Sequence, residues 1–322
     1  MRGEGSGHDV HYGHELSGGL AIVSDVRATI VVCTHRHGDE LVATLAALLQ
    51  EVPAATEILL VRSGTPTGSP LPESIEPWFS DGLIRAICVS DAGLARARAA
   101  GLRAASAEAV LWLDDDVRPR PGWFRDLIAP FTDPRVGATG GTILPDWPNG
   151  RPPSWLPRKL TTYFGERHAG PTAGHHPFGA NMAVRRSAVE DVGALDPTLG
   201  VSGSALGLHE ETELCERLSA AGYRIVEAPG AIVDHSIRPE QISVRWVFRR
   251  AWHHGRSDLL RDLPKGRADT PTRIVKLLGL VASWPIALLH PRAAVYVTTR
   301  VLVNVAYLRY RVDASRSGAR SS

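Results

Sequence analysis

Short apolar runs alternate with helix-forming segments between residues 28 and 113, and no other feature limits the possible folds as strongly. The runs have the length and β-branched content of buried strands, at residues 28–33, 57–61, 83–89 and 109–113. Between them, residues 39–50 carry leucines at helical spacing and residues 93–105 are rich in alanine. This alternation predicts an α/β fold with a parallel sheet covered on both faces.

Three adjacent aspartates, Asp114, Asp115 and Asp116, directly follow the fourth apolar run. In open α/β sheets, ligands bind outside the carboxyl ends of the strands. Carboxylates gathered at that edge can hold a hard divalent cation, which in turn binds substrate phosphates. An acidic turn that caps the next helix near Trp123 explains the same residues without a ligand, so the cluster alone leaves both interpretations open.

A second acidic site begins the helix predicted over residues 210–221. Glutamates in its first turn are stabilised by the helix dipole, and this is a sufficient explanation for Glu210. Glu211 differs because it precedes Leu214 by three positions and Leu218 by seven, so it points along the apolar face. A carboxylate there needs a partner or a task, and a general base at the rim of a cleft has such a task.

Two features lie between these acidic sites. Gly179 and Asn181 belong to a run of small residues that would let the backbone approach a ligand closely, although a plain turn into a strand explains them equally well. Ser187 and Glu190 predict a capping box for a short helix that ends at Gly193.

The composition is that of a folded domain. With 322 residues, 43% of them hydrophobic, the chain can bury a substantial core. Cys33, Cys88 and Cys215 lie far apart and lack CxxC spacing. Their spacing argues against a disulfide framework and a cysteine-rich zinc site, and it fits a reducing compartment.

The two ends of the chain differ from its centre. Residues 1–19 are rich in glycine and histidine without an apolar run, so we expect no signal peptide and a disordered tail over residues 1–27. His8, His11 and His14 in this tail resemble a metal-binding tract, although a flexible tail is the simpler explanation.

The C-terminal segment is basic. From Ser236 onward, 16 Lys and Arg residues face 5 Asp and Glu, or +11, whereas the remainder has 20 against 29, or −9. Residues 243–261 predict a basic amphipathic helix, which suits phosphates or anionic lipid but is also explained by a solvated face. Residues 277–289 and 293–308 are apolar but shorter than the roughly 20 residues of a spanning helix. They predict a helical hairpin that packs on the domain or docks at a membrane interface.

Four sequence blocks, in this order, resemble the family 2 glycosyltransferases of the GT-A fold. They are TIVVCTHRHGDEL, DAGLARARAAGLRAASAEAVLWLDDDV, GANMAVRRSAVEDVGALD and HEETELCERLSAAGY. The resemblance covers residues 28–235 and implies a GT-A domain there, with a mostly parallel nucleotide-binding sheet flanked by helices. We expect residues 236–322 to form a basic, partly apolar helical extension. A sugar nucleotidyltransferase and a dinucleotide-dependent oxidoreductase are disfavoured because CTHRHGDEL lacks their glycine-rich loops.

The resemblance also implies roles for single residues. Glu211 takes the place of the family's catalytic aspartate, with an arm one methylene longer. A divalent metal, Mg or Mn, would be held by Asp114, Asp116 and His235. The nucleotide-sugar donor would be contacted by Thr34, His35, Arg36, Arg96, Asp114, Asp115, Gly179, Asn181 and Glu210.

The implied activity is an inverting, metal-dependent, hexosyltransferase-like transfer to a hydroxyl of a glycan, a lipid or a small molecule. We expect the acceptor to lie against residues 143–174, which include Trp147, Trp155, Tyr163 and Phe164. Arg62 stands where the family usually has a base-contacting aspartate, so the nucleotide base stays open. The alternative is a non-catalytic nucleotide-sugar or glycan-binding protein of the same fold.

We expect such a protein in the cytoplasm, where its C-terminal extension would either pack on the domain or make peripheral contact with the inner face of the cell membrane. It implies work on cell envelope polysaccharide and no nucleic acid partner.

Overall fold

The computed structural model describes residues 28–35, 38–54, 56–170, 176–202 and 205–318. The N-terminal tail expected over residues 1–27, including His8, His11 and His14, lies outside the described residues.

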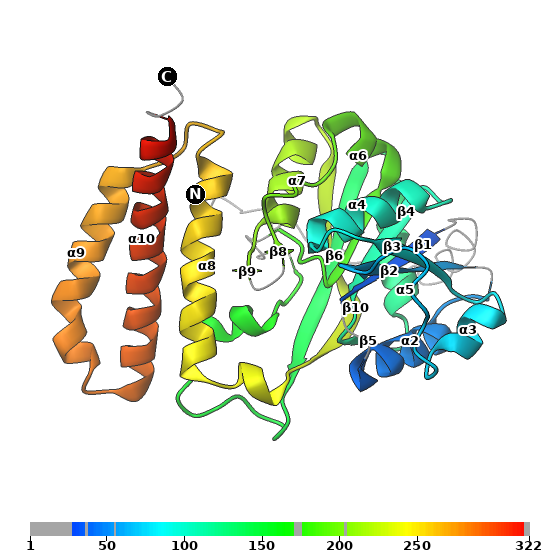
Figure 1. Ribbon diagram of the computed structural model, residues 1–322, viewed down its shortest axis with the longest axis horizontal. Helices are drawn as coiled ribbons and strands as arrows, with labels where there is room; N and C mark the ends of the chain where they lie inside the picture. The colour runs from blue at the N-terminus through cyan, green and yellow to red at the C-terminus, as the bar shows by residue number, and fades with distance from the viewer. Residues whose placement is uncertain (1–27, 36–37, 55, 171–175, 203–204, 319–322) are drawn as a thin grey trace, which may run out of the picture.

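A mixed eight-stranded sheet forms the centre of the molecule, in the order β3-β2-β1-β4-β7-β6-β10-β5 (Figure 1). Parallel pairs join β1 to β2 and β4, β2 to β3, and β6 to β10. β7 is antiparallel to both neighbours and β5 is antiparallel to β10. The strands are β1 (Ala28–Thr34), β2 (Glu57–Ser63), β3 (Arg85–Val89), β4 (Ala109–Asp114), β5 (Val117–Pro119), β6 (Val136–Asp146), β7 (Asn181–Arg185) and β10 (Arg224–Ser236), and a separate hairpin pairs β8 (Val201–Ser202) with β9 (Ala205–Leu206). The predicted α/β fold with flanking helices is confirmed.

Helices cover both faces of the sheet because side chains alternate along each strand. Ile30 and Val32 of β1 pack with Leu41 and Leu45 on one face, whereas Val31 packs on the other. The first face carries α2 (Asp39–Glu51) and α5 (Trp123–Ile128), and the second carries α4 (Leu94–Ala104), α6 (Arg186–Val192) and α7 (Glu210–Ala220). Shorter elements are α3 (Glu76–Ser80), η2 (Ala129–Thr132), η3 (Arg158–Phe164) and η4 (Pro239–Gln241).

Three long helices form a layer beside the sheet: α8 (Val244–Asp262), α9 (Thr270–Ala287) and α10 (Pro291–Gly318). In Figure 1 they stand side by side, with α8 nearest the sheet and α9 on the far side of α10. A third hydrophobic cluster joins them to the connection that follows β6, since Phe164 and Tyr163 pack with Val247 of α8 and Val303 of α10. The expected C-terminal helical region is therefore present. Among the described residues, no helix is long and apolar enough to cross a membrane.

The predicted capping box is wrong. α6 begins at Arg186 with Arg185 as its N-cap, and no side chain caps it. Ser187 therefore lies inside the helix, where its hydroxyl donates to Glu108, and Glu190 lies 3.7 Å from Arg186. The helix starts early because β7 leads into it without an intervening turn. Similarly, α9 extends through Pro285 and begins before the segment predicted from residue 277.

Candidate active site

Arg98 of α4 joins three carboxylates at the carboxyl edge of the sheet. Its guanidinium lies 2.9 Å from Asp114 Oδ1, 3.1 Å from Glu210 Oε1 and 2.9 Å from Glu211 Oε1. The side chain of Arg98 is only 1% exposed. Burial opposes its charge, but the three carboxylates raise its pKa. We call these four residues the Arg98 cluster; because acids outnumber the base, it can accommodate further positive charge.

Within this cluster, Glu211 and Glu210 have opposite protonation preferences. Burial acts to raise the pKa of Glu211, yet Arg98 and a hydrogen bond from the Gly179 N–H, at 2.9 Å, keep it below its usual range. Burial, followed by repulsion from Glu211, raises the pKa of Glu210 to about 8. Neighbouring groups with divergent pKa values are typical of acid–base sites. The geometry therefore leaves Glu211 ionised and able to accept a proton.

Gly179 allows the close contact that completes the cluster. A Cβ at this position would lie 2.2 Å from Arg98 Cζ. Glycine is therefore required at position 179 so that the Arg98 guanidinium can approach the backbone. Arg98 itself was missed, although a signal existed: it follows Leu94 and precedes Leu102 by four positions, so an arginine on the inward helix face required anionic partners.

Thr34 and Asp115 meet where the adjacent strands β1 and β4 end. The Thr34 hydroxyl donates to Asp115 Oδ2 at 2.5 Å, and the Thr44 hydroxyl donates to the Asp115 carbonyl at 3.1 Å. Burial, followed by repulsion from Asp116, raises the pKa of Asp115 to about 7. His35 follows Thr34 in an exposed bend, and Arg36 lies outside the described residues.

Asp116 and His235 form a donor pair that fits a divalent metal. His235 Nε2 lies 3.3 Å from Asp116 Oδ1, and Arg238 donates to the other carboxylate oxygen at 2.8 Å. Burial opposes ionisation of Asp116, but His235 and Arg238 lower its pKa to about 2. The Phe164 carbonyl, 2.8 Å from His235 Nδ1, can only accept, so Nδ1 carries a proton and Nε2 faces the carboxylate. Burial opposes the charge on His235, but Asp116 raises its pKa, so a metal held by this carboxylate and imidazole would take the place of the Nε2 proton.

The predicted metal set of Asp114, Asp116 and His235 is only partly assembled, because Asp114 faces Arg98 instead. Among the described residues, three possible metal ligands come within 4.8 Å of one another at a different place: His209, His254 and Asp258.

This second group connects α8 to the start of α7. His209, the N-cap of α7, has φ 82° and is the only described non-glycine residue with positive φ. Its Nε2 lies 2.9 Å from Asp258 Oδ1 of α8, while Arg273 of α9 donates to Asp258 Oδ2 at 2.8 Å. Burial opposes ionisation of Asp258, but its histidine partners lower the pKa of this carboxyl. The C-terminal helices thereby fix the backbone next to Glu210.

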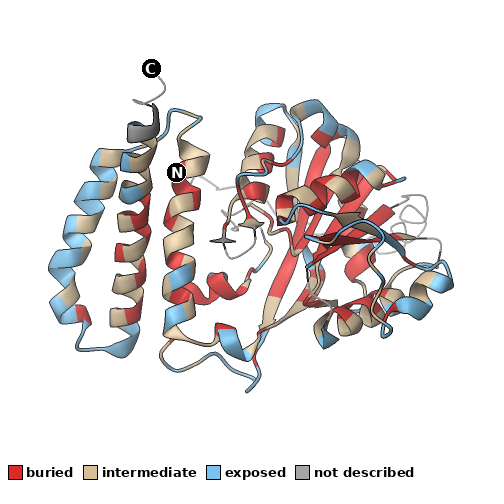
Figure 2. Cartoon of the chain, viewed as in Figure 1, coloured by how far each residue is buried: buried red, intermediate tan, exposed pale blue. Residues whose placement is uncertain are grey.

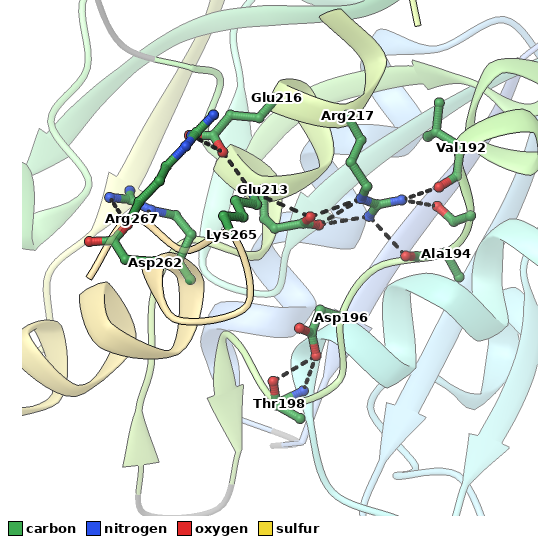
Figure 3. A network of polar contacts seen from close by, with 12 residues as sticks. Val192, Ala194, Asp196, Thr198, Glu213, Glu216, Arg217, Asp262, Lys265 and Arg267 are labelled. Carbon is green, nitrogen blue, oxygen red and sulfur yellow. Dashed lines mark hydrogen bonds and ion pairs between the residues drawn. The ribbon is translucent and has the colours of Figure 1, made fainter. Parts of the chain in front are cut away.

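Polar contacts also fix the outer side of α7 (Figure 3). Arg217 donates to the Glu213 carboxylate at 2.9 Å and to the carbonyls of Val192 and Ala194 at 2.6 and 2.9 Å. Lys265, after α8, donates to Glu216 at 2.6 Å. Polar contacts therefore hold α7 to the end of α6 on one side and to the α8–α9 connection on the other.

Two residues predicted to contact the nucleotide-sugar donor bind protein carbonyl groups in the structure. Asn181 is fully buried, and its carboxamide donates to the Thr142 and Ala231 carbonyls at 2.9 and 2.8 Å while accepting from Trp123 Nε1 at 2.8 Å. It therefore joins β7 to its neighbours in the interior. Arg96 donates to the carbonyl of Ala92, which lies just before α4, at 3.1 Å.

The aromatic residues expected to form the acceptor platform are largely core residues. Trp147, Tyr163 and Phe164 are at most 8% exposed and belong to the third hydrophobic cluster. Their rings pack against α8, as in the Phe164–Trp246 pair with centroids 5.0 Å apart, so they offer no open face to a sugar. Trp155, the fourth, is half-buried against the same cluster.

Arg62, which departs from the family pattern, has a local structural task. It is 4% exposed, and its guanidinium donates to the carbonyls of Ser69 and Pro70 at 2.8 and 2.9 Å. It thereby fixes the loop after β2.

Arg250 of α8 places a further cation near the acidic groups. Burial lowers its pKa, whereas the charges of Glu210, Glu211 and Asp114 act to raise it. Its Nε atom is buried without a hydrogen-bond partner, and its guanidinium lies 5.7 Å from the Trp246 ring centroid. A buried guanidinium with an unused donor is suited to an anionic ligand.

Comparison with known proteins bears on these features. The sequence model of Glycosyl transferase family 2 matches residues 29–193, just over half of the chain. The glucosyl-dolichyl phosphate glucuronosyltransferase of Haloferax volcanii is 24% identical over 269 residues, covering 80% of this chain and 84% of that protein. The pre-mycofactocin glycosyltransferase of Mycobacterium tuberculosis is 34% identical over 169 residues, covering 51% of this chain but only 34% of that protein.

Among solved structures, the mannosyltransferase PcManGT from Pyrobaculum calidifontis, in complex with GDP-Man and Mn2+, has a TM-score of 0.55. It is 19% identical, and the match covers 89% of this chain and 75% of that one. At this identity the likeness concerns the fold.

Proposed function

This chain belongs to Glycosyl transferase family 2, and we propose that it transfers a sugar from a nucleotide-sugar donor to an acceptor hydroxyl, with inversion at the anomeric carbon. The observation that carries this proposal is the position of Glu211. Its ionised carboxylate is held by Arg98 and the Gly179 N–H at the carboxyl edge of the sheet, where α/β folds bind their ligands.

The reaction is a single displacement. The acceptor oxygen attacks C1 of the donor sugar, its proton passes to a Glu211 carboxylate oxygen, and the bond from C1 to the phosphate oxygen breaks with both electrons leaving on the nucleoside diphosphate. Arg98 and the Gly179 N–H keep Glu211 charged and fixed in direction before the proton arrives. Much of the rate would come from this positioning.

The leaving group is the second task of the site. Asp116 and His235 are the residues that would hold a divalent metal, and such a metal, when bound, offsets negative charge on the diphosphate. The Arg250 guanidinium, whose Nε is buried without a hydrogen-bond partner, would supply a further cation for the same oxygens. Asp115, fixed by the hydrogen bond from Thr34, would accept a hydrogen bond from a hydroxyl of the donor ribose or sugar.

The acceptor class is proposed as lipid-linked. The Haloferax volcanii relative, which matches this chain over most of both sequences, is named for a dolichyl phosphate substrate. We extend this to work on envelope glycans at the cytoplasmic face of the membrane, and we leave the donor base open because Arg62 is committed to its own loop.

Thermal unfolding with a panel of nucleotide sugars, with and without Mn2+, tests donor binding, since a ligand of the folded state raises the melting temperature. Donor hydrolysis and transfer are then compared for the wild type, Glu211→Gln and Asp116→Asn, with Glu216→Gln as the control on the outer side of α7. We expect Glu211→Gln to bind donor while losing transfer at least about a hundredfold.

Two results would contradict the proposal. If the wild type binds a nucleotide sugar but neither hydrolyses nor transfers it, the protein is the non-catalytic binder. If no nucleotide sugar changes the melting temperature with either Mg2+ or Mn2+, donor binding itself is refuted.

A further inference from the structure

The outermost helix carries an exposed apolar surface. Of the nine large hydrophobic residues that are exposed among the described residues, seven lie on α9 or the turn after it: Ile274, Val275, Leu278, Val281, Ile286, Leu288 and Leu289. We call these seven residues the α9 outer face. Their exposure reaches 71% at Ile286 and 74% at Leu289. In Figure 2, α9 is largely pale blue along the side away from α10.

The distribution of polar and apolar residues on α9 is the reverse of that expected for a helix exposed to water. Arg273, Leu277, Leu280 and Trp284 are half-buried at helical spacing, and Arg273 lies over the Tyr307 ring of α10 at 4.3 Å. This side already packs on the protein. A surface helix normally turns charged and polar residues to solvent on its other side, whereas α9 has no acidic residue and offers mainly aliphatic side chains there. Such a continuous patch marks an interaction site.

The charge around this surface identifies the occupant. Residues 270–315 contain six Lys and Arg residues and one Asp. Lys276 within α9 and Arg292 at the start of α10 are both exposed. A second copy of the chain docked here by twofold symmetry would bring these like charges together. A bilayer with anionic headgroups is complementary to them, because it attracts Lys and Arg while its acyl boundary accepts aliphatic side chains.

We propose that α9 lies in the headgroup layer of an anionic bilayer, with the α9 outer face inserted toward the acyl chains and Lys276 and Arg292 at the headgroups. Docking by α9 is independent of the proposed sugar transfer, although it would bring the active site to a surface that holds lipid-linked acceptors.

Vesicle co-sedimentation of the full chain tests this docking without donor or turnover. Vesicles of equimolar phosphatidylcholine and phosphatidylglycerol should pellet the wild type at low salt, and vesicles of phosphatidylcholine alone should not. Leu278→Asp and Ile286→Asp should each weaken binding at least about tenfold, because a charge replaces an inserted aliphatic group. Lys276→Gln combined with Arg292→Gln should weaken binding and reduce its salt dependence.

The matched control is Leu83→Asp, which introduces the same charge at an exposed leucine before β3, outside the C-terminal helices. Circular dichroism should show that each aspartate variant keeps the wild-type melting temperature. The proposal is overturned if the wild type stays in the supernatant with anionic vesicles, or if Leu83→Asp loses as much binding as Leu278→Asp. Analytical ultracentrifugation adds a third refutation: a lipid-free dimer that Leu278→Asp dissociates means that a second copy covers α9.

Because vesicle binding and donor-dependent thermal shift are measured separately, loss of one leaves the other interpretable. A chain that binds nucleotide sugars but not vesicles refutes only the membrane docking, and the reverse result refutes only the proposed function.

Discussion

At the scale of single residues, the candidate site depends on one close backbone approach. Gly179 contacts the Arg98 guanidinium so closely that even a methyl group would displace it. We expect Gly179→Ala to lower transfer at least about tenfold, because Arg98 and Glu211 would both move. Gly170→Ala is the control, since a Cβ there meets nothing within 4 Å. Equal activity of the two variants would show that the Arg98 cluster does not set the rate.

Away from the site, Glu57 makes a pH-dependent contribution to stability. Its carboxylate accepts from Thr29 at 2.7 Å, from the Ser106 N–H and hydroxyl, each at 2.8 Å, and from Arg85 at 3.0 Å. Burial opposes ionisation, but these bonds lower its pKa from 4.5 to about 2. A depressed folded-state pKa stabilises the protein above the unfolded-state value, and this stabilisation is lost as the pH falls from 4.5 toward 2.

Glu57→Gln should therefore lower the free energy of unfolding at neutral pH by about 1–3 kcal/mol. It should also flatten the acid limb of the stability curve. Urea unfolding across that pH range measures both effects, with the exposed Glu73→Gln as the control. An unchanged acid limb in Glu57→Gln would refute the assignment.

The sequence predicted the site residues that belong to local patterns, but it did not predict the long-range contacts between side chains. The aspartates after β4 and the inward Glu211 could be inferred because strand ends and helical spacing are local patterns. Asn181 was assigned to the donor, although its carboxamide is buried among three protein partners. Partners 39 to 58 positions away in the chain, such as Thr142 and Trp123, leave no local pattern.

At the scale of elements, α8 contributes a core surface and places the half-buried cation of Arg250 near the acidic groups. Trp147 and Phe164 were expected to contact an acceptor but pack against α8 and α10. The expectation failed for the same reason as for Asn181, because the partners lie far away in the chain. From sequence alone, an aromatic residue in a proline-rich segment is taken as exposed, because the helix that covers it begins 80 or more positions later.

Two adjacent arginines of α8 allow a matched test of this element. Arg250 is half-buried with an unused Nε donor, whereas Arg249 is exposed. We expect Arg250→Gln to raise the donor KM at least about tenfold, because a charge-assisted contact to phosphate is lost. Arg249→Gln should leave it unchanged. Steady-state kinetics decide, and an equal effect of both variants would show that only the general basicity of α8 matters.

At the scale of the whole molecule, the α/β fold and the family could both be predicted from four ordered motif blocks, and both are confirmed. The division into a domain of residues 28–235 and an extension of residues 236–322 stays a prediction. The third hydrophobic cluster contains residues from both sides of that boundary, including Phe164 and Val247. We infer that the two segments fold as one unit.

A chain that ends at residue 235 tests this inference. It would expose the third hydrophobic cluster, so we expect it to aggregate or to lose a cooperative thermal transition. The full chain should unfold in one transition. Near-ultraviolet circular dichroism and calorimetry measure both, and a soluble, cooperatively folded 1–235 chain that binds donor would contradict the inference.

The left-handed backbone of His209 has a consequence for sequence variation among relatives. Elsewhere, replacing such a residue with glycine relieves strain and is favourable. Here it would remove the 2.9 Å partner of Asp258 Oδ1, leaving that oxygen only His254 at 3.5 Å, while Arg273 still occupies the other oxygen. Positions 209 and 258 should therefore covary, so that relatives without the histidine also lack the aspartate. A comparison of related sequences at these two positions would therefore show whether the start of α7 and the C-terminal helices vary together.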